Sequence, residues 1–264
     1  MKVFAKKKEN VQKTGIDLFK TIEFISLVSM EDIILYSDQK DALGHISVDC
    51  VIFGFQNKQL NVLLVKRPIL DKVAKWTLPG GAVRKKENLL DTAKRVLFDM
   101  TNIQDIFLKQ VKTFGKVQRI PSYRSITVSY YALVNTSQYE LLANNAKISE
   151  VKWFPIDEVP TLEIDHNDII EECRSRLQEE AIRKPIGIKL LDNLFPLNHL
   201  QYLYEAIFDK KFDNRNFRKK VMKLGMIDVT EKVQENVPHR AGKLYKFNEK
   251  KYEELQKKGI YFEI

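Results

Sequence analysis

The sequence has few cysteines and no long apolar run, and each absence excludes a class of protein. Only two of its 264 residues are cysteine, Cys50 and Cys173, and they lie far apart in apolar surroundings. That usage builds neither a disulfide framework nor a zinc site, so we expect both thiols to be reduced and buried. No run reaches the roughly 18 apolar residues of a membrane-spanning helix. The lysine-rich start lacks the apolar core of a secretory signal, which predicts a cytoplasmic protein without a membrane partner.

The positive charge of the chain is concentrated near its C-terminus. The net charge is +9. Residues 184–264 contain 17 Lys and Arg against 11 Asp and Glu, so this third of the chain holds +6 of the excess. A basic domain indicates a polyanionic partner such as nucleic acid, although a basic surface also serves solubility. Charge alone leaves both interpretations open.

Hydrophobic patterning divides the chain into three parts. Residues 1–44 combine a lysine-rich start with an apolar stretch that has no clear turn chemistry, so we treat them as an extension, in which Met30 is a candidate natural start. Residues 45–183 mix strand and helix patterns. Residues 184–264 have a different character, because Pro185 pushes the residue before it out of the helical region and ends the preceding helix.

The middle part predicts a mixed sheet between helices. Its β-rich runs are residues 48–55, 60–67, 111–119, 125–134 and 149–155. Its helical patterns cover residues 87–101 and 167–183, with an inward stripe of Ile170, Cys173 and Leu177 in the second. In the fourth run, from Ile126 to Val134, every second side chain is apolar, which is the pattern of a strand with one buried face. We therefore expect an α+β chain whose first domain is an α/β/α sandwich.

The last part predicts a winged helix-turn-helix. Helical patterns at 186–195, 198–209 and 213–226 lead into a turn at 237–242 and a strand at 243–247. In the third helix, Phe217, Val221 and Leu224 share one face, and Asp213 is a candidate N-cap. The basic residues on the opposite face and in the turn are typical of DNA contacts. The predicted DNA-binding residues are Asn214, Arg215, Asn216, Arg218, Lys219, His239, Arg240 and Lys243.

A motif from Gly80 to Ile103, GGAVRKKENLLDTAKRVLFDMTNI, keeps the spacing of a diphosphate-hydrolysing site but lacks most of its carboxylates. Together with WTLP just before it, this motif resembles the conserved box of the Nudix family. The residues that match the box are Gly81, Glu87, Arg95, Leu97 and Ile103. The metal-binding carboxylate positions hold Val96, Asp99 and Met100, and the closing glycine is Asn102.

One aspartate and Glu87 offer Mg²⁺ too few oxygens, so we expect no metal, no cofactor and no enzyme activity. Three roles of this domain stay open: a sensor that binds a small molecule, an active hydrolase, and a scaffold without a ligand. The concave site of the fold favours a sensor.

The candidate effector-binding residues lie on strands leading to that site and before the second helix. They are Asp49, Arg67, Gly81, Asp165 and His166. For Asp165 and His166 an alternative role is capping of the helix that follows.

The C-terminal part, from PIGIKLLDNLF to VPHRAGKLYKF, resembles the winged helix of Nudix-related bacterial transcriptional regulators. That resemblance, covering residues 45–250, implies a homodimer that represses by binding a double-stranded DNA operator and senses a small molecule. Members respond to sugars such as arabinose or to ADP-ribose in NAD metabolism. AKRVL in the box resembles the sugar-responsive branch, so we expect a pentose such as L-arabinose, with ADP-ribose as the alternative. A protein-binding adaptor is a further possibility for the basic domain.

Overall fold

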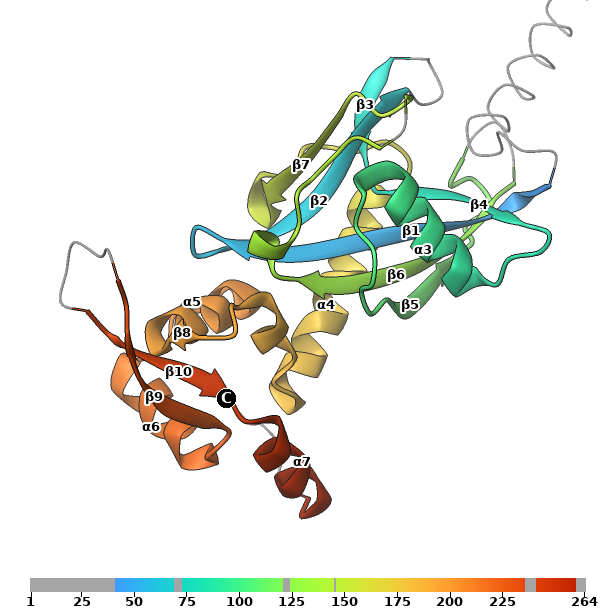
Figure 1. Ribbon diagram of the computed structural model, residues 1–264. Coiled ribbons are helices and arrows are strands. Elements are labelled where there is room, and N and C mark those ends of the chain that lie inside the picture. Colours follow the sequence, from blue (N-terminus) through green and yellow to red (C-terminus); the bar gives the residue numbers. More distant parts are fainter. Residues whose placement is uncertain (1–40, 69–72, 121–123, 145, 236–240, 260–264) are drawn as a thin grey trace, which may run out of the picture.

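The structure is a computed structural model that describes residues 41–68, 73–120, 124–144, 146–235 and 241–259. Residues 1–40 of the N-terminal extension, which include Met30, lie outside the described residues, as do His239 and Arg240, whereas residues 42–44 of the extension belong to the first strand of the sheet. Figure 1 shows a larger sheet domain above a smaller domain of helices and a short sheet. Within the described ranges, no helix is long and apolar enough to cross a membrane.

The larger domain is built on a mixed sheet. Its seven described strands are β1 (Ala42–Gln56), β2 (Gln59–Pro68), β3 (Ala74–Thr77), β4 (Gly80–Arg84), β5 (Lys109–Phe114), β6 (Ile126–Val134) and β7 (Glu150–Pro155). The main path runs β3-β2-β1-β6-β5, with β4 on β1 and β7 on β2. Strands β1 and β6 pair in parallel and the other pairs are antiparallel, so the predicted mixed sheet is confirmed.

Helices α3 (Leu89–Thr101) and α4 (His166–Arg183) cover opposite faces of this sheet. Alternate residues of β1 separate the two cores: Val48 and Cys50 pack with α3, whereas Val51 and Phe53 pack with α4. The predicted inward stripe of α4 is buried. The two cysteines are buried and free, as expected.

Strand β6 differs from the one-sided alternation of its sequence. Thr127, Ser129 and Tyr131 are buried like their neighbours, because a central strand of a sandwich is covered on both faces. Strands β3 and β4 were not predicted, because they are only four and five residues long and are separated by Leu78 and Pro79. Three short 3₁₀ helices complete the connections: η1 (Thr136–Gln138), η2 (Ile156–Glu158) and η3 (Ile186–Leu190).

The smaller domain has the helix order of a winged helix-turn-helix. Its elements are β8 (Phe195–Pro196), α5 (Leu197–Phe208), α6 (Asn214–Leu224), β9 (Ile227–Val233), β10 (Lys243–Phe247) and α7 (Glu249–Lys257). Strand order β8-β10-β9 forms the small sheet. The first predicted helix, 186–195, is only the 3₁₀ turn η3, and α7 was not predicted. The core of this domain is continuous with that under α4, and Gln178 of α4 donates to the carbonyl of Ile207 at 2.8 Å.

Capping explains where α6 begins and ends. Asp213 caps α6 as predicted, since its carboxylate accepts from the amide of Asn216 at 2.9 Å. Gly225 ends this helix in the left-handed conformation, at φ 64°. Helix α5 begins at Leu197, one residue before the predicted helical pattern at 198–209, and its N-cap position is Pro196. The buried face of α5 is formed by Leu200, Leu203, Tyr204 and Ile207.

Candidate nucleic-acid interface and sensor site

Helix α6 presents a polar and basic face to solvent. Phe217 and Val221 are buried in the winged-helix core, which fixes the rotation of the helix. Arg215 and Lys219 project from the opposite side and are exposed. An exposed helix with this composition and width fits the major groove of DNA.

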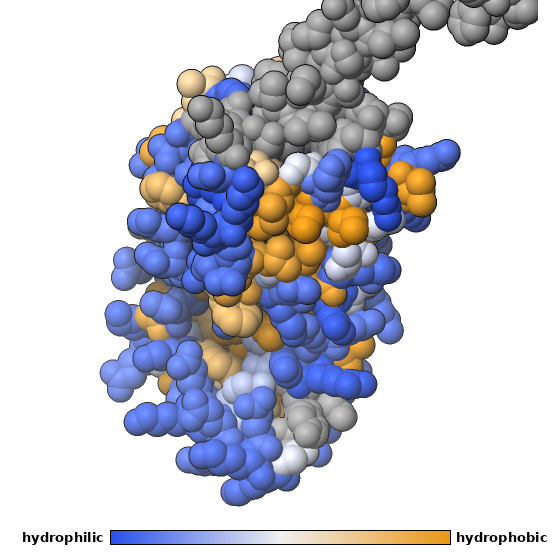
Figure 2. Space-filling view, turned by 90° about the vertical axis from the view of Figure 1, so that its right-hand side faces the viewer, coloured by the Kyte–Doolittle hydropathy of each residue, from blue (hydrophilic) through white to orange (hydrophobic). Residues whose placement is uncertain are grey.

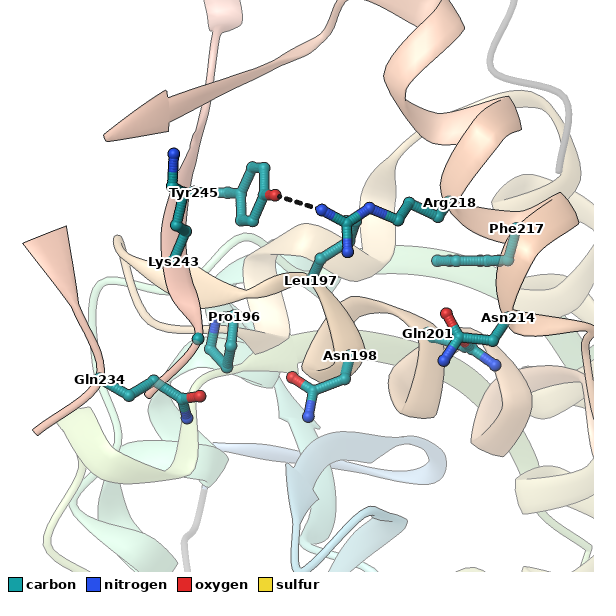
Figure 3. A pocket seen from close by; sticks show the side chains of 11 residues that line it. Pro196, Leu197, Asn198, Gln201, Asn214, Phe217, Arg218, Gln234, Lys243 and Tyr245 are labelled. Carbon is teal, nitrogen blue, oxygen red and sulfur yellow. Dashed lines mark hydrogen bonds between the residues drawn. The ribbon is translucent and has the colours of Figure 1, made fainter. Parts of the chain in front are cut away.

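A groove of about 310 Å³ lies beside this helix (Figure 3). It is bounded by the start of α5, the start of α6, and strands β9 and β10, which we call the wing. Its polar side chains are Asn198, Gln201, Asn214, Arg218, Gln234 and Lys243. Neutral amides and two cations in a concave surface match the donors that bind a phosphodiester backbone.

Arg218 has a defined position at the edge of this groove. Its guanidinium Nη2 donates to the hydroxyl of Tyr245 at 3.3 Å. Tyr245 is a buried residue of β10, so this hydrogen bond holds the guanidinium of Arg218 beside that strand. Helix α6, the predicted recognition helix, is thereby joined to the wing through one side-chain contact.

Of the predicted DNA-binding residues, the structure brings Asn214, Arg218 and Lys243 together in one groove. Arg215, Asn216 and Lys219 lie on the exposed face of the same helix. Sequence reasoning missed Asn198 and Gln201 on α5 and Gln234 after β9. Their signal was weak, because an amide residue in an amphipathic helix has no distinctive spacing.

The turn between α5 and α6 is organised by Glu205, which is buried. Its carboxylate accepts from the side-chain amide of Gln201, the backbone N–H of Phe212 and the ammonium of Lys211, each at 3.0 Å. Burial raises the pKa of Glu205, but these three donors outweigh burial and hold the pKa below its ordinary value. The ionised carboxylate therefore fixes the turn that leads into α6.

In the altered Nudix box, the carboxylate of Glu87 forms an ion pair with Arg95. Arg95 donates to its carboxylate at 2.6 Å through Nε and at 2.9 Å through Nη2, and Arg95 also binds the carbonyl of Ala82 at 3.0 Å. The hydrogen bonds from Arg95 lower the pKa of Glu87. This glutamate and arginine brace the loop between β4 and α3.

The remaining box positions do not form a carboxylate cluster. Val96 is buried against Gly81. A Cβ atom added to Gly81 would lie 3.0 Å from Cγ2 of Val96. Asp99 lies 3.7 Å from Arg95. Asn102 adopts φ 60°, so it supplies the left-handed end of α3 that the family glycine would give. In the part of the chain that the structure describes, no group of three or more His, Cys, Asp or Glu side chains is arranged to hold a metal ion.

A buried polar cluster lies on the other face of the sheet, under the start of α4. Arg119 donates to both carboxylate oxygens of Asp165, at 2.9 Å from Nε, and to the hydroxyl of Thr127 at 3.0 Å. His166 Nδ1 lies 3.0 Å from the hydroxyl of Thr77. Its Nε2 faces Asp49 Oδ1 at 3.9 Å.

Asp49 Oδ1 and His166 Nε2 are both buried and, among the described residues, neither has a hydrogen-bond partner. Burial lowers the pKa of His166, so its ring is neutral near pH 7. Gly80 allows this close packing, because a Cβ there would lie 1.9 Å from Asp49 Oδ1. Two buried polar atoms without hydrogen-bond partners in one place are unusual in a native protein.

The predicted effector residues are brought together only in part. Asp49, Asp165 and His166 belong to the buried cluster, and Arg67 adjoins it by donating to the carbonyl of Gly80 at 3.0 Å. Gly81 faces α3 on the opposite side of the sheet. The capping role considered for Asp165 was wrong: it occupies the N-cap position of α4, but its side chain makes no cap hydrogen bond and binds Arg119 instead. Sequence reasoning missed Arg119, which it placed at the end of a strand.

Comparison with known proteins agrees with both domains. Residues 43–173 match the family model of the NUDIX domain, and residues 187–247 match that of the NrtR DNA-binding winged helix domain. A relative from Acinetobacter baylyi, described as an ADPR responsive transcriptional repressor NtrR, is 31% identical over 206 residues, which are 76% of this chain and 81% of the relative. The chain belongs to the NrtR family of Nudix-related regulators.

Solved structures of Shewanella oneidensis NrtR have the same two-domain fold. The structure complexed with a 27mer DNA is 28% identical, with a TM-score of 0.68 over 82% of this chain and 97% of that one. A second NrtR structure is 29% identical, with a TM-score of 0.64 over 77% of this chain and 94% of that one. In this chain, α6 and the adjoining groove lie within the segment that matches the NrtR winged helix domain, and they carry exposed basic side chains.

Proposed function

We propose that this NrtR-family protein is a transcriptional repressor that ADP-ribose releases from its operator. Its family makes it a DNA-binding transcriptional regulator with a Nudix-type sensor domain. The Acinetobacter baylyi relative, described as ADPR responsive and matched over both domains, carries the finer assignment. This relative supports the alternative effector of the sequence analysis better than the pentose.

The altered box is compatible with binding a diphosphate. Hydrolysis needs a metal held by several carboxylates, whereas binding alone needs only guanidinium, ammonium or backbone N–H donors. Arg84 ends β4, and Lys85 and Lys86 follow it in the loop, where both lysines are exposed. The replacement of box carboxylates by Val96 and Met100 therefore favours a sensor over an enzyme, but it does not distinguish a sugar from ADP-ribose.

The proposed organisation follows from these sites. Residues 45–183 form the sensor domain, residues 184–264 form the DNA-binding domain, and residues 1–44 are an extension. Asp49, Arg67, Asp165 and His166 are the proposed effector-side residues, supported by the unpartnered atoms of Asp49 and His166. Gly81 lies in β4 and faces α3, so it is proposed only as a part of the altered box and not as a member of the buried cluster. As a regulator of operator DNA, the protein is proposed to act in the cytoplasm.

We propose a homodimer that reads two half-sites of a pseudo-palindromic operator. Figure 2 shows apolar side chains gathered on one face, viewed from the side of β4 in Figure 1. At this end of the sheet, Leu43, Ile46 and Ile126 are exposed, and the two isoleucines are paired across β1 and β6. Light scattering should give twice the chain mass of 30.9 kDa, and Ile126→Glu should shift the mass toward one chain. A monomeric wild-type protein would contradict the dimer.

The test of function uses a duplex selected from a random-sequence pool by rounds of binding to the full chain. ADP-ribose added to the complex should lower operator affinity by about 5–150-fold, the range typical of allosteric coupling, as measured by gel shift. L-Arabinose at the same concentration should have no effect. Release by arabinose and not by ADP-ribose would reverse the effector assignment.

A further inference from the structure

The tip of the β1–β2 hairpin reaches from the sensor domain to the DNA-binding domain. In Figure 1 this hairpin lies beside α5. Its two turn residues, Asn57 and Lys58, have φ of 53° and 64°, a tight turn that fixes the direction of both side chains. The ammonium of Lys58 lies 4.6 Å from the ring centroid of Tyr202 on α5, within the range of a cation–π contact.

A cleft of about 400 Å³ lies around this contact. The sensor domain contributes the hairpin and the end of β7, including Lys58 and Asp157. The DNA-binding domain contributes the second half of α5 and the turn after it, including Tyr202, Glu205 and Lys211. The cleft therefore lies between the two domains at the turn that precedes α6, beside the hydrophobic core that α5 shares with the sensor domain.

Glu205 connects this cleft to the DNA-facing groove. Its carboxylate lines the cleft and holds the turn through Lys211 and Phe212. It also accepts from Gln201, one helical turn earlier, and Gln201 lines the groove beside α6. Gln201 further donates to the carbonyl of Phe212 at 3.0 Å. A single hydrogen-bonded network thus spans α5 from the sensor side to the DNA side.

We propose that Lys58, seated on Tyr202, is the contact through which the sensor domain positions the recognition helix. Displacement of the hairpin moves α5 at Tyr202, and the Gln201–Glu205 network transfers that movement to the turn and the start of α6. Lys58 is a positioning residue, because it touches neither the DNA-facing groove nor the buried cluster of Asp49 and His166. This inference rests on the proposed response to ADP-ribose.

The test compares Lys58→Met with a matched control, Lys152→Met. Lys58 is exposed, and methionine keeps its length while removing its charge. Lys152 makes a similar contact, 5.1 Å above the ring of Phe154, but lies wholly within the sensor domain. Operator affinity of each full-length variant is measured by fluorescence anisotropy with and without ADP-ribose, and ADP-ribose affinity is measured by calorimetry.

In Lys58→Met, the affinities for ADP-ribose alone and for operator alone should stay within about twofold of wild type, while the effect of ADP-ribose on operator affinity falls by about two- to fivefold. Tyr202→Leu should give the same loss, and the double variant no further loss, because both remove one contact. Lys152→Met should behave as wild type.

Two results overturn the inference, and they are distinguishable. An undiminished ADP-ribose effect in Lys58→Met rejects this contact while leaving the proposed function intact. No ADP-ribose effect in the wild-type protein rejects the proposed function and the inference together.

Discussion

Replacing Arg119 with methionine is expected to lower the free energy of unfolding by about 3–5 kcal/mol, because it leaves a buried carboxylate without its partner. The side chain of Arg119 is 2% exposed and that of Asp165 12%, so water replaces the lost donor only in part. Arg119 also lies 3.9 Å from Asp49 through Nη2, so the substitution removes its positive charge from a second buried acid. Urea unfolding followed by circular dichroism measures the change.

A surface ion pair provides the control. Lys112 lies 2.6 Å from Glu172, but the two side chains are 53% and 39% exposed. Lys112→Met should therefore cost at most about 1 kcal/mol. If both substitutions cost the same, the cluster under α4 does not depend on an enclosed ion pair, and its role in the sensor domain must be reconsidered.

Replacing Arg215 with alanine should weaken operator binding by about 1–3 kcal/mol, if its guanidinium reads a guanine through two hydrogen bonds. Arg218→Ala should cause a loss of similar size, and it should also free the hydroxyl of Tyr245. Both residues are exposed on α6, so neither substitution should lower thermal stability by more than a small amount. Anisotropy titrations with the selected duplex give the affinities.

Arg183→Ala is the matched control, because Arg183 is exposed at the end of α4 and carries the same charge. Its substitution should change operator affinity by less than about twofold at physiological salt, since exposed charges separated by more than about 8 Å are largely screened. Full operator affinity in both Arg215→Ala and Arg218→Ala would show that α6 is not the docking surface.

Sequence patterns predicted those features that local interactions determine. The side chain of Asp213 starts α6 through an amide three residues away, and Phe217 and Val221 fix its inner face, so both could be read from spacing. The spacing of the Nudix box likewise located α3 to within two residues.

Long-range contacts determine the parts that the sequence did not reveal. Arg119 and Asp165 are 46 residues apart and meet only after the sheet and α4 have assembled. The local expectation for Asp165, a helix cap, was wrong because a buried arginine binds its carboxylate more strongly than backbone amides do. The same limit applies to the effector: a metal-poor box indicates what the site does not catalyse, but a sequence motif in one helix does not specify the ligand.

The central claim is that the Nudix-type domain binds ADP-ribose without consuming it and thereby releases DNA. The most direct measurement is the anisotropy of a labelled operator bound to the full chain, followed for hours after one addition of ADP-ribose in the presence of Mg²⁺. The account predicts a fall in anisotropy that persists, because the effector remains intact. An unchanged signal, or a fall that recovers as ADP-ribose is hydrolysed, would contradict it.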